Sequence, residues 1–193
     1  MIEVPAVFQP RNQQRVFRLL LDAMARPGTQ ADLSPWTGSK PAYLAILASL
    51  CDGGTTLADP DGLLSAEDLR FLACPQTDAA SAAFIAARGD AAPGPRFQPP
   101  LGTLTAPELG ATILLCIETL AARGRDRLQA ILSGPGIEEE KRCELGTLHP
   151  AWMERRAGWV SFFPLGADFI VCDRSRAVAL PRTTRAVICG GRA

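Results

Sequence analysis

The last twenty residues hold the densest group of side chains that could do chemistry. Five arginines and no acidic residue occur there, at positions 174, 176, 182, 185 and 192. Within this segment, Arg182-Thr183-Thr184 follows Pro181, whose ring fixes one backbone dihedral angle. A guanidinium binds a phosphate or carboxylate through paired hydrogen bonds, and threonine hydroxyls add further donors. The segment therefore predicts either an anion- or partner-binding site or an internal ion pair.

Two upstream carboxylates, Glu108 and Asp168, are the candidate internal partners of Arg182. If Arg182 pairs with one of them, it holds the fold together, and its loss destabilises the free chain. If it binds an external anion or a partner, the free chain tolerates its loss. Because the local charge is wholly positive over twenty residues, the external anion or partner is slightly favoured.

Residues for other common reaction types are sparse. The only histidine, His149, directly precedes Pro150, which is typical of a capping or packing position at a helix entry. No GxSxG, HExxH or P-loop pattern occurs, and no closely spaced cysteines could hold an iron–sulfur cluster. The only lysines, Lys40 and Lys141, lie in polar surroundings that do not favour a desolvated, Schiff-base-forming amine. We therefore expect neither a metal nor pyridoxal phosphate.

A glycine-containing turn offers a weaker candidate. Gly134-Pro135-Gly136 resembles a phosphate-binding loop, but such a loop works through free backbone N–H groups and Pro135 has none. Three glutamates follow at positions 138–140, where they would repel a phosphate. The pattern is more typical of a tight turn from a strand into a helix.

Composition is that of a soluble globular protein. The chain has 193 residues, 47% of them hydrophobic and 21% charged, with 20 basic and 20 acidic residues. This balance predicts one domain over residues 1–193 and no general attraction to nucleic acid or to an anionic membrane. The longest apolar stretches, 42–51 and 110–117, are shorter than the roughly 20 residues of a membrane helix. Six scattered cysteines and no signal-peptide pattern favour reduced, mostly buried thiols and a cytoplasmic location.

Hydrophobic periodicity and turn signals predict an α/β domain with a mixed sheet. Proline and glycine fill much of 91–102, which is expected to be a loop. The apolar run 111–120 predicts a buried central strand with 128–132 as its possible neighbour, and the last two strands form an antiparallel pair around a connection at 173–176. The expected helices are 12–26, 41–50, 65–73, 137–144 and 150–156, and the expected strands are 55–58, 82–87, 111–120, 128–132, 167–172 and 177–180.

Five sequence blocks, in this order, carry a resemblance to a known family. They are Phe17-Arg18-x-Leu20-Leu21-x-Ala23-Met24-x-x-Pro27-Gly28; Gly102-Thr103 before Pro107-Glu108-x-Gly110-Ala111-Thr112; Gly134-Pro135-Gly136-Ile137; Phe163-Pro164-Leu165-Gly166-x-Asp168; and Leu180-Pro181-Arg182-Thr183-Thr184. The chain resembles the H subunits of bacterial carbon–phosphorus lyase, the PhnH family, from Phe17 to Cys189. Our candidate binding residues come from these blocks: Arg18, Glu108, Asp168, Arg182, Thr183 and Thr184.

The resemblance implies a function that the residues alone do not indicate. Proteins of this family belong to a cytoplasmic core complex of G, H, I and J subunits. With the L protein, the G, H and I subunits transfer a phosphonate to the ribose of ATP, which makes the assembly an alpha-D-ribose 1-methylphosphonate 5-triphosphate synthase. The family implies a homodimer and a three-layer fold similar to the large domain of pyridoxal-phosphate-dependent transferases, without the cofactor. It supplies no catalytic residue.

These implications lead to one favoured interpretation and two alternatives. We expect a structural or substrate-lining subunit that is not catalytic by itself, because positioning a partner's active site needs no local chemistry. The alternatives are a small-anion or nucleotide-binding regulatory protein, which would use Arg182-Thr183-Thr184, and an autonomous transferase with the pyridoxal-phosphate fold.

Overall fold

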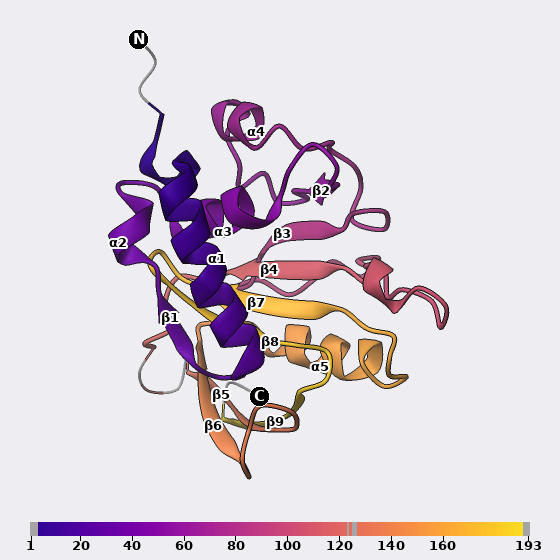
Figure 1. The fold of residues 1–193 in the computed structure, drawn as a ribbon. Coiled ribbons are helices and arrows are strands. Elements are labelled where there is room, and N and C mark those ends of the chain that lie inside the picture. The colour runs from indigo at the N-terminus through magenta and orange to yellow at the C-terminus, as the bar shows by residue number, and fades with distance from the viewer. Residues whose placement is uncertain (1–3, 123, 125–126, 191–193) are drawn as a thin grey trace.

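A six-stranded mixed sheet forms the middle of the molecule (Figure 1). The computed structural model describes residues 4–122, 124 and 127–190. The strand order is β1-β8-β7-β4-β3-β2, in which the four strands from β7 to β2 are parallel and β8 and β1 add two antiparallel pairings. The strands are β1 (Gln30–Asp32), β2 (Leu57–Ala58), β3 (Phe84–Arg88), β4 (Thr112–Cys116), β7 (Asp168–Cys172) and β8 (Arg176–Leu180).

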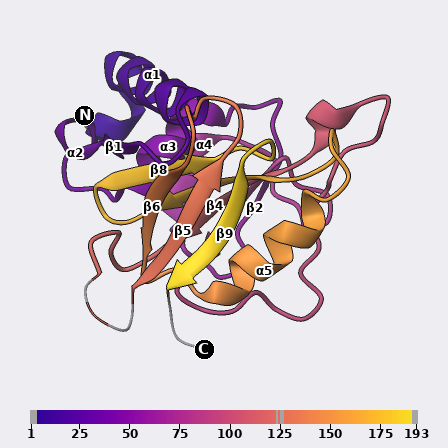
Figure 2. The same ribbon diagram turned by 90° about the horizontal axis from the view of Figure 1, so that it is seen from below.

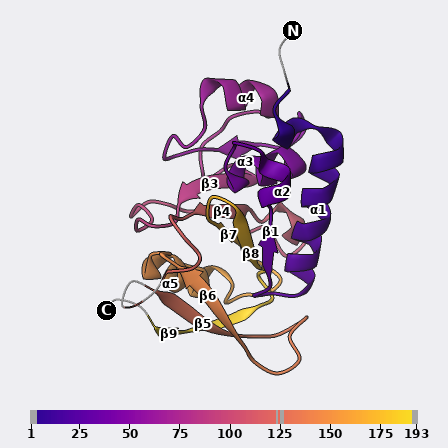
Figure 3. The same cartoon turned by 90° about the vertical axis from the view of Figure 1, so that its left-hand side faces the viewer.

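Helices cover one face of this sheet (Figure 3). The longest, α1 (Pro10–Ala25), buries Val16, Leu20 and Ala23 at helical spacing. These side chains share a core cluster with α3 (Ala42–Leu50) and with inward-facing strand residues such as Leu114. The same layer holds η1 (Ala6–Phe8), α2 (Ser34–Thr37) and α4 (Ala66–Leu72).

The opposite face is covered by one helix and a second sheet (Figure 2). The helix is α5 (Pro150–Trp159), and the three-stranded antiparallel sheet has the order β6-β5-β9. Trp152 and Trp159 of α5 pack against Phe169 of β7 at ring-centroid distances of 6.3 and 6.2 Å. The strands are β5 (Leu128–Ser133), β6 (Lys141–Gly146) and β9 (Arg185–Gly190); the short η2 (Pro107–Leu109) lies in the connection before β4. The molecule is therefore a three-layer α/β structure with a mixed central sheet.

Several predicted elements are confirmed. β4 is a central strand between β3 and β7, and β7 and β8 form the expected antiparallel pair. Ser65 and Asp68 form the capping box expected at the start of α4. The proline-rich run 91–102, all of which is described, contains no helix and only a single bridge residue, Leu101. No helix in the described part of the chain is long and apolar enough to cross a membrane.

The helix predicted at 137–144 is wrong. Residues 141–146 form β6, which pairs antiparallel with β5 through registers such as Ala130↔Cys143. Cys143 and Leu145 are buried, while Arg142 between Lys141 and Cys143 is exposed. Alternation of buried and exposed residues is typical of a strand. The glutamates at 138–140 led to the helix prediction, because a run of charges is also typical of a solvated helix face.

The placement of 128–132 beside the strand at 111–120 is also wrong. This segment is β5, which lies in the second sheet between β6 and β9, not in the central sheet with β4. The partner strand β9 and the edge strand β1 were not predicted. β1 has only three residues, and the apolar residues of β9 are consecutive and do not alternate with polar ones. The strand character of both therefore comes from pairing with β8 and β5.

Candidate functional site

Arg182 forms an internal ion pair with Asp168. Its Nη2 and Nε donate to Oδ2 of Asp168 at 2.6 and 3.1 Å, and its backbone N–H donates to Oδ1 at 2.7 Å. The side chains are 14% and 21% exposed, so water screens the pair only partly. Of the two alternatives for Arg182, the structure thus contains the internal pair. A ligand or partner role for Arg182 stays a prediction.

The other candidate residues are only partly brought together. Glu108 is exposed on η2, and the groups that accept from Arg182 there are the backbone carbonyls of Pro107 (2.7 Å) and Gly110 (3.4 Å). Thr183 and Thr184 lie next to Arg182, with Thr183 exposed and Thr184 buried. Arg18 is exposed on α1, across the central sheet from α5, so it does not join this group (Figure 3).

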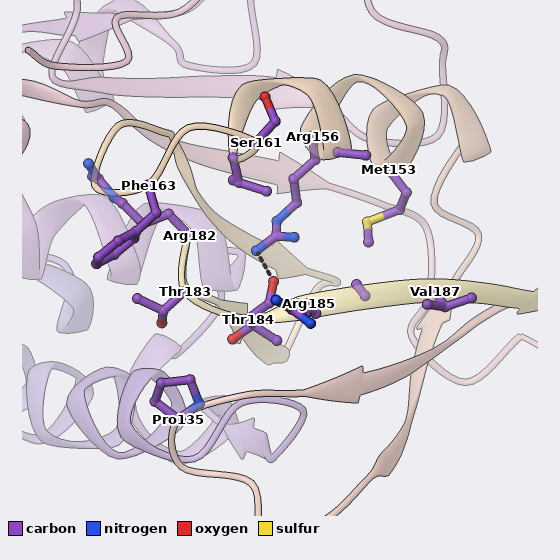
Figure 4. Close-up of a pocket in the computed structure, with 13 residues that line it drawn as sticks. Pro135, Met153, Arg156, Ser161, Phe163, Arg182, Thr183, Thr184, Arg185 and Val187 are labelled. Atoms are coloured by element: carbon purple, nitrogen blue, oxygen red, sulfur yellow. Dashed lines mark hydrogen bonds between the residues drawn. The ribbon is translucent and has the colours of Figure 1, made fainter.

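A cavity of about 580 Å³ opens between α5 and the chain segment that leads into β9 (Figure 4). Thirteen of the described residues line it, and none of these is acidic. Its polar lining comprises three guanidinium and three hydroxyl side chains, and the rest is apolar or small. The polar residues are Arg156, Ser161, Arg182, Thr183, Thr184 and Arg185. The cavity is therefore a cationic pocket with apolar walls.

Arg156 is the buried charge of this cationic pocket. Its guanidinium reaches from α5 to the β8–β9 connection, where Nη2 donates to the carbonyls of Pro181 (2.5 Å) and Thr184 (3.1 Å) (Figure 4). It also lies over the ring of Phe169, with Cζ 5.7 Å from the ring centroid. Burial lowers the pKa of Arg156 to about 10, so the group still carries its charge at neutral pH.

Sequence reasoning missed Arg156, although a signal for it exists. Met153 lies three residues before Arg156 and Trp159 three residues after it, and all three side chains are buried. A charge within the apolar stripe of an amphipathic helix must be buried with its own hydrogen-bond partners. The predicted helix 150–156 ended at Arg156, which removed Trp159 from the pattern and made Arg156 look like a solvated terminal residue.

The two lysines and the histidine make structural contacts. Lys40 donates to Asp68 at 2.8 Å, and this hydrogen bond raises the pKa of Lys40 above its ordinary value. Lys141 donates to the hydroxyl of Thr29 at 2.8 Å. His149 caps α5, as expected, by accepting the backbone N–H of Ala151 at its Nδ1. Within the described ranges, no three His, Cys, Asp or Glu side chains are grouped to hold a metal ion.

The Gly134-Pro135-Gly136 turn joins β5 to β6. It is a strand-to-strand turn, closed by a hydrogen bond from Ile137 N–H to the Gly134 carbonyl at 3.1 Å, and not the predicted entry to a helix. Pro135 lines the cationic pocket. Arg192, the last arginine of the C-terminal segment, lies outside the described residues.

Comparison with known proteins matches residues 7–187 to the family described as bacterial phosphonate metabolism protein (PhnH). The chain belongs to the PhnH family. It is 34% identical over 178 residues to the putative C-P lyase subunit protein HtxG of Stutzerimonas stutzeri, which covers 92% of this chain and 87% of that protein. It is 30% identical over 184 residues to the alpha-D-ribose 1-methylphosphonate 5-triphosphate synthase subunit PhnH of Rhizobium meliloti, with coverages of 89% and 88%.

Three of the PhnH-like sequence blocks meet at Arg182. Its side chain contacts the block at 107–112 through Pro107 and Gly110, and the block at 163–168 through Asp168. Residues of three blocks also line the cationic pocket: Pro135, Phe163 and the segment 182–184. Segments that are far apart in the chain, and that carry much of the family resemblance, therefore meet around Arg182 and the cationic pocket.

Proposed function

We propose that this protein is the H subunit of a carbon–phosphorus lyase core complex in phosphonate catabolism. In this role it takes part, in the cytoplasm, in forming ribose 1-methylphosphonate 5-triphosphate from ATP and methylphosphonate. The observation that carries the proposal is identity of 34% and 30% to subunits with these names over about nine tenths of the chain.

Within that complex, the chain has a structural or substrate-lining role. This is supported by how its buried charges are used: Arg182 and Arg156 each hold two loop carbonyls in place. A rigid surface of this kind can fix the geometry of a neighbouring subunit, and fixing reactants in place contributes to rate without any local acid or base. The isolated chain is accordingly not catalytic.

The partners that follow are a second copy of the chain and the G, I and J subunits. The fold is proposed to correspond to the large domain of pyridoxal-phosphate-dependent transferases without its cofactor. The absence of the cofactor is supported by the hydrogen bonds of Lys40 to Asp68 and of Lys141 to Thr29, since each amine already has a partner. Adding pyridoxal phosphate should therefore give no Schiff-base absorbance.

Co-expression tests the proposal. The tagged chain should co-purify with untagged G, I and J subunits, and ATP and methylphosphonate should be converted only when the chain, its partner subunits and the L protein are all present. Light scattering of the free chain should give twice its monomer mass of 20.6 kDa. Turnover by the purified chain alone would contradict the non-catalytic role. If none of the three subunits co-purified with the chain, its membership of the complex would be contradicted.

A further inference from the structure

The cationic pocket holds two arginines whose charge no ion pair balances. Arg182 is neutralised by Asp168, but Arg156 and Arg185 form no ion pair with any residue that the structure describes. Among the described residues, the carboxylate whose charge stabilises protonated Arg156 is that of Asp168, and its hydrogen bonds come from Arg182. The pocket therefore carries about two positive charges in excess, which match a dianion.

Two polar atoms at this pocket are buried without a partner. The three hydrogen bonds of Arg156 within the described chain all come from Nη2, and its Nε has none. The hydroxyl of Thr184 is also buried and has no partner among the residues that the structure describes. Arg156 is 2% exposed and Thr184 1%. An unmade hydrogen bond on a buried group costs roughly 1–3 kcal/mol. Both atoms are closed to water in the free chain, so a ligand completes their hydrogen bonds once the two side chains turn toward the cavity that they line.

The rest of the pocket is apolar and larger than one anion requires. Met153 and Val160 of α5 and its following turn form one wall, and Phe163 and Val187 add large apolar surface. Phe163 and Val187 are 68% and 66% exposed in the free chain. Pockets of roughly 300–1,000 Å³ with apolar walls and a few polar groups are typical of small organic ligands.

We propose that this pocket binds a small organic phosphate, with Arg156, Arg185 and Thr184 on its phosphoryl group and Phe163 and Val187 against its organic part. A phosphoryl group offers three oxygens and up to two negative charges, whereas a carboxylate offers two oxygens and one charge. The two unbalanced arginines and the unpartnered hydroxyl therefore fit the phosphoryl group better. The inference goes beyond the proposed function and does not depend on it, because it concerns the free chain.

Calorimetry on the full chain at low salt tests the assignment with four probes: phenyl phosphate, inorganic phosphate, sulfate and benzoate. We expect phenyl phosphate to bind most tightly, inorganic phosphate and sulfate more weakly, and benzoate at least about tenfold more weakly than phenyl phosphate, as one lost charge-assisted hydrogen bond implies. Benzoate binding as tightly as phenyl phosphate would overturn the phosphoryl assignment. Equal affinities for phenyl phosphate and inorganic phosphate would overturn the assignment of Phe163 and Val187 to the organic part of the ligand.

Two substitutions that should leave the fold intact locate the site. Arg185→Gln removes an exposed charge, and Thr184→Val replaces a hydroxyl that has no partner among residues 4–122, 124 and 127–190, so neither should lower the melting temperature. Each should weaken phenyl phosphate binding by about tenfold. Arg142→Gln, an exposed charge on β6 outside the pocket, is the matched control and should bind as the wild type does. Equal weakening in all three variants, or in none, would overturn the site.

Discussion

The carboxylate of Asp168 accepts hydrogen bonds from both the backbone and the side chain of Arg182. Asp168 begins β7 and Arg182 follows the end of β8, so the pair closes the open end of the β7–β8 hairpin. The guanidinium then continues to the Pro107 carbonyl, 75 residues away in sequence. One side chain thus joins the hairpin to the segment that precedes β4.

Arg182→Ala should lower the free energy of unfolding by about 3 kcal/mol, because it leaves Asp168 largely buried without its cation. Urea denaturation measures the loss. Arg174→Ala is the matched control: Arg174 belongs to the same basic segment, but it is exposed, and the one hydrogen bond of its side chain to a described residue is a 3.4 Å bond to the Ser39 carbonyl. Its loss should stay within about 0.5 kcal/mol. Equal, small losses in both variants would assign Arg182 to an external ligand or partner instead.

Asp173 should make stability depend on pH in the acid range. Burial alone would raise the pKa of Asp173, but hydrogen bonds from the backbone amides of Ser175, Leu120 and Arg176 and from the Arg176 guanidinium outweigh it and lower the pKa below its ordinary value of 3.8. A lowered folded-state pKa gives stability that is present above the unfolded-state pKa and is lost as the pH falls through the folded-state pKa.

Asp173→Asn should therefore be less stable than the wild type at neutral pH, and the difference should shrink below about pH 4, near the ordinary pKa of an aspartate. Thermal melting between pH 7 and pH 2.5 measures both effects. Asp78→Asn, at an exposed position, should follow the wild-type curve. A constant difference between Asp173→Asn and the wild type over the whole range would show that proton binding at Asp173 is not the cause.

Ser65 should stabilise α4 through its capping box. Its hydroxyl accepts the backbone N–H of Asp68 at 3.1 Å, and the Asp68 carboxylate accepts the backbone N–H of Ser65 at 3.2 Å. Ser65→Ala removes the first of these bonds and the 2.7 Å bond that the hydroxyl donates to the Asp68 carboxylate, and it should cost about 1 kcal/mol of unfolding free energy. Ser81→Ala, at an exposed turn position, should change stability by less than about 0.5 kcal/mol. Indistinguishable melting curves for the two variants would contradict the cap.

The Arg182–Asp168 pair was one of the alternatives that the sequence offered, and a local hairpin is what forms it. Two apolar runs separated by a polar connection indicate antiparallel pairing, and Phe169↔Leu180 registration then brings Asp168 and Arg182 together. Glu108 was the other candidate, and its distance from Arg182 depends on how a loop folds. The sequence alone could list both carboxylates, but it could not decide between them.

The cationic pocket could not be predicted, because it depends on long-range packing. One wall is α5 and the other is the segment into β9, a strand formed only by pairing with β5. Short strands whose residues lack a clear alternation have no local signal, so tertiary context decides them. Without β9, nothing in the sequence places Arg156 and Arg185 at the same cavity. The basic C-terminal segment indicated Arg182 instead, which forms an ion pair with Asp168.

Substitutions at Gly146 and Gly62 test the contact between the end of β6 and the segment around Thr119, which follows β4. Both have a positive φ, of 57° and 66°. A Cβ at Gly62 would meet no atom within 4 Å, whereas at Gly146 it would overlap the Thr119 carbonyl oxygen, which accepts a hydrogen bond from Thr147. Gly62→Ala should cost about 1 kcal/mol for the left-handed backbone. Gly146→Ala should cost roughly 3 kcal/mol, because overpacking against backbone adds to that strain. Equal losses in urea denaturation would mean that β6 and this segment are not in contact.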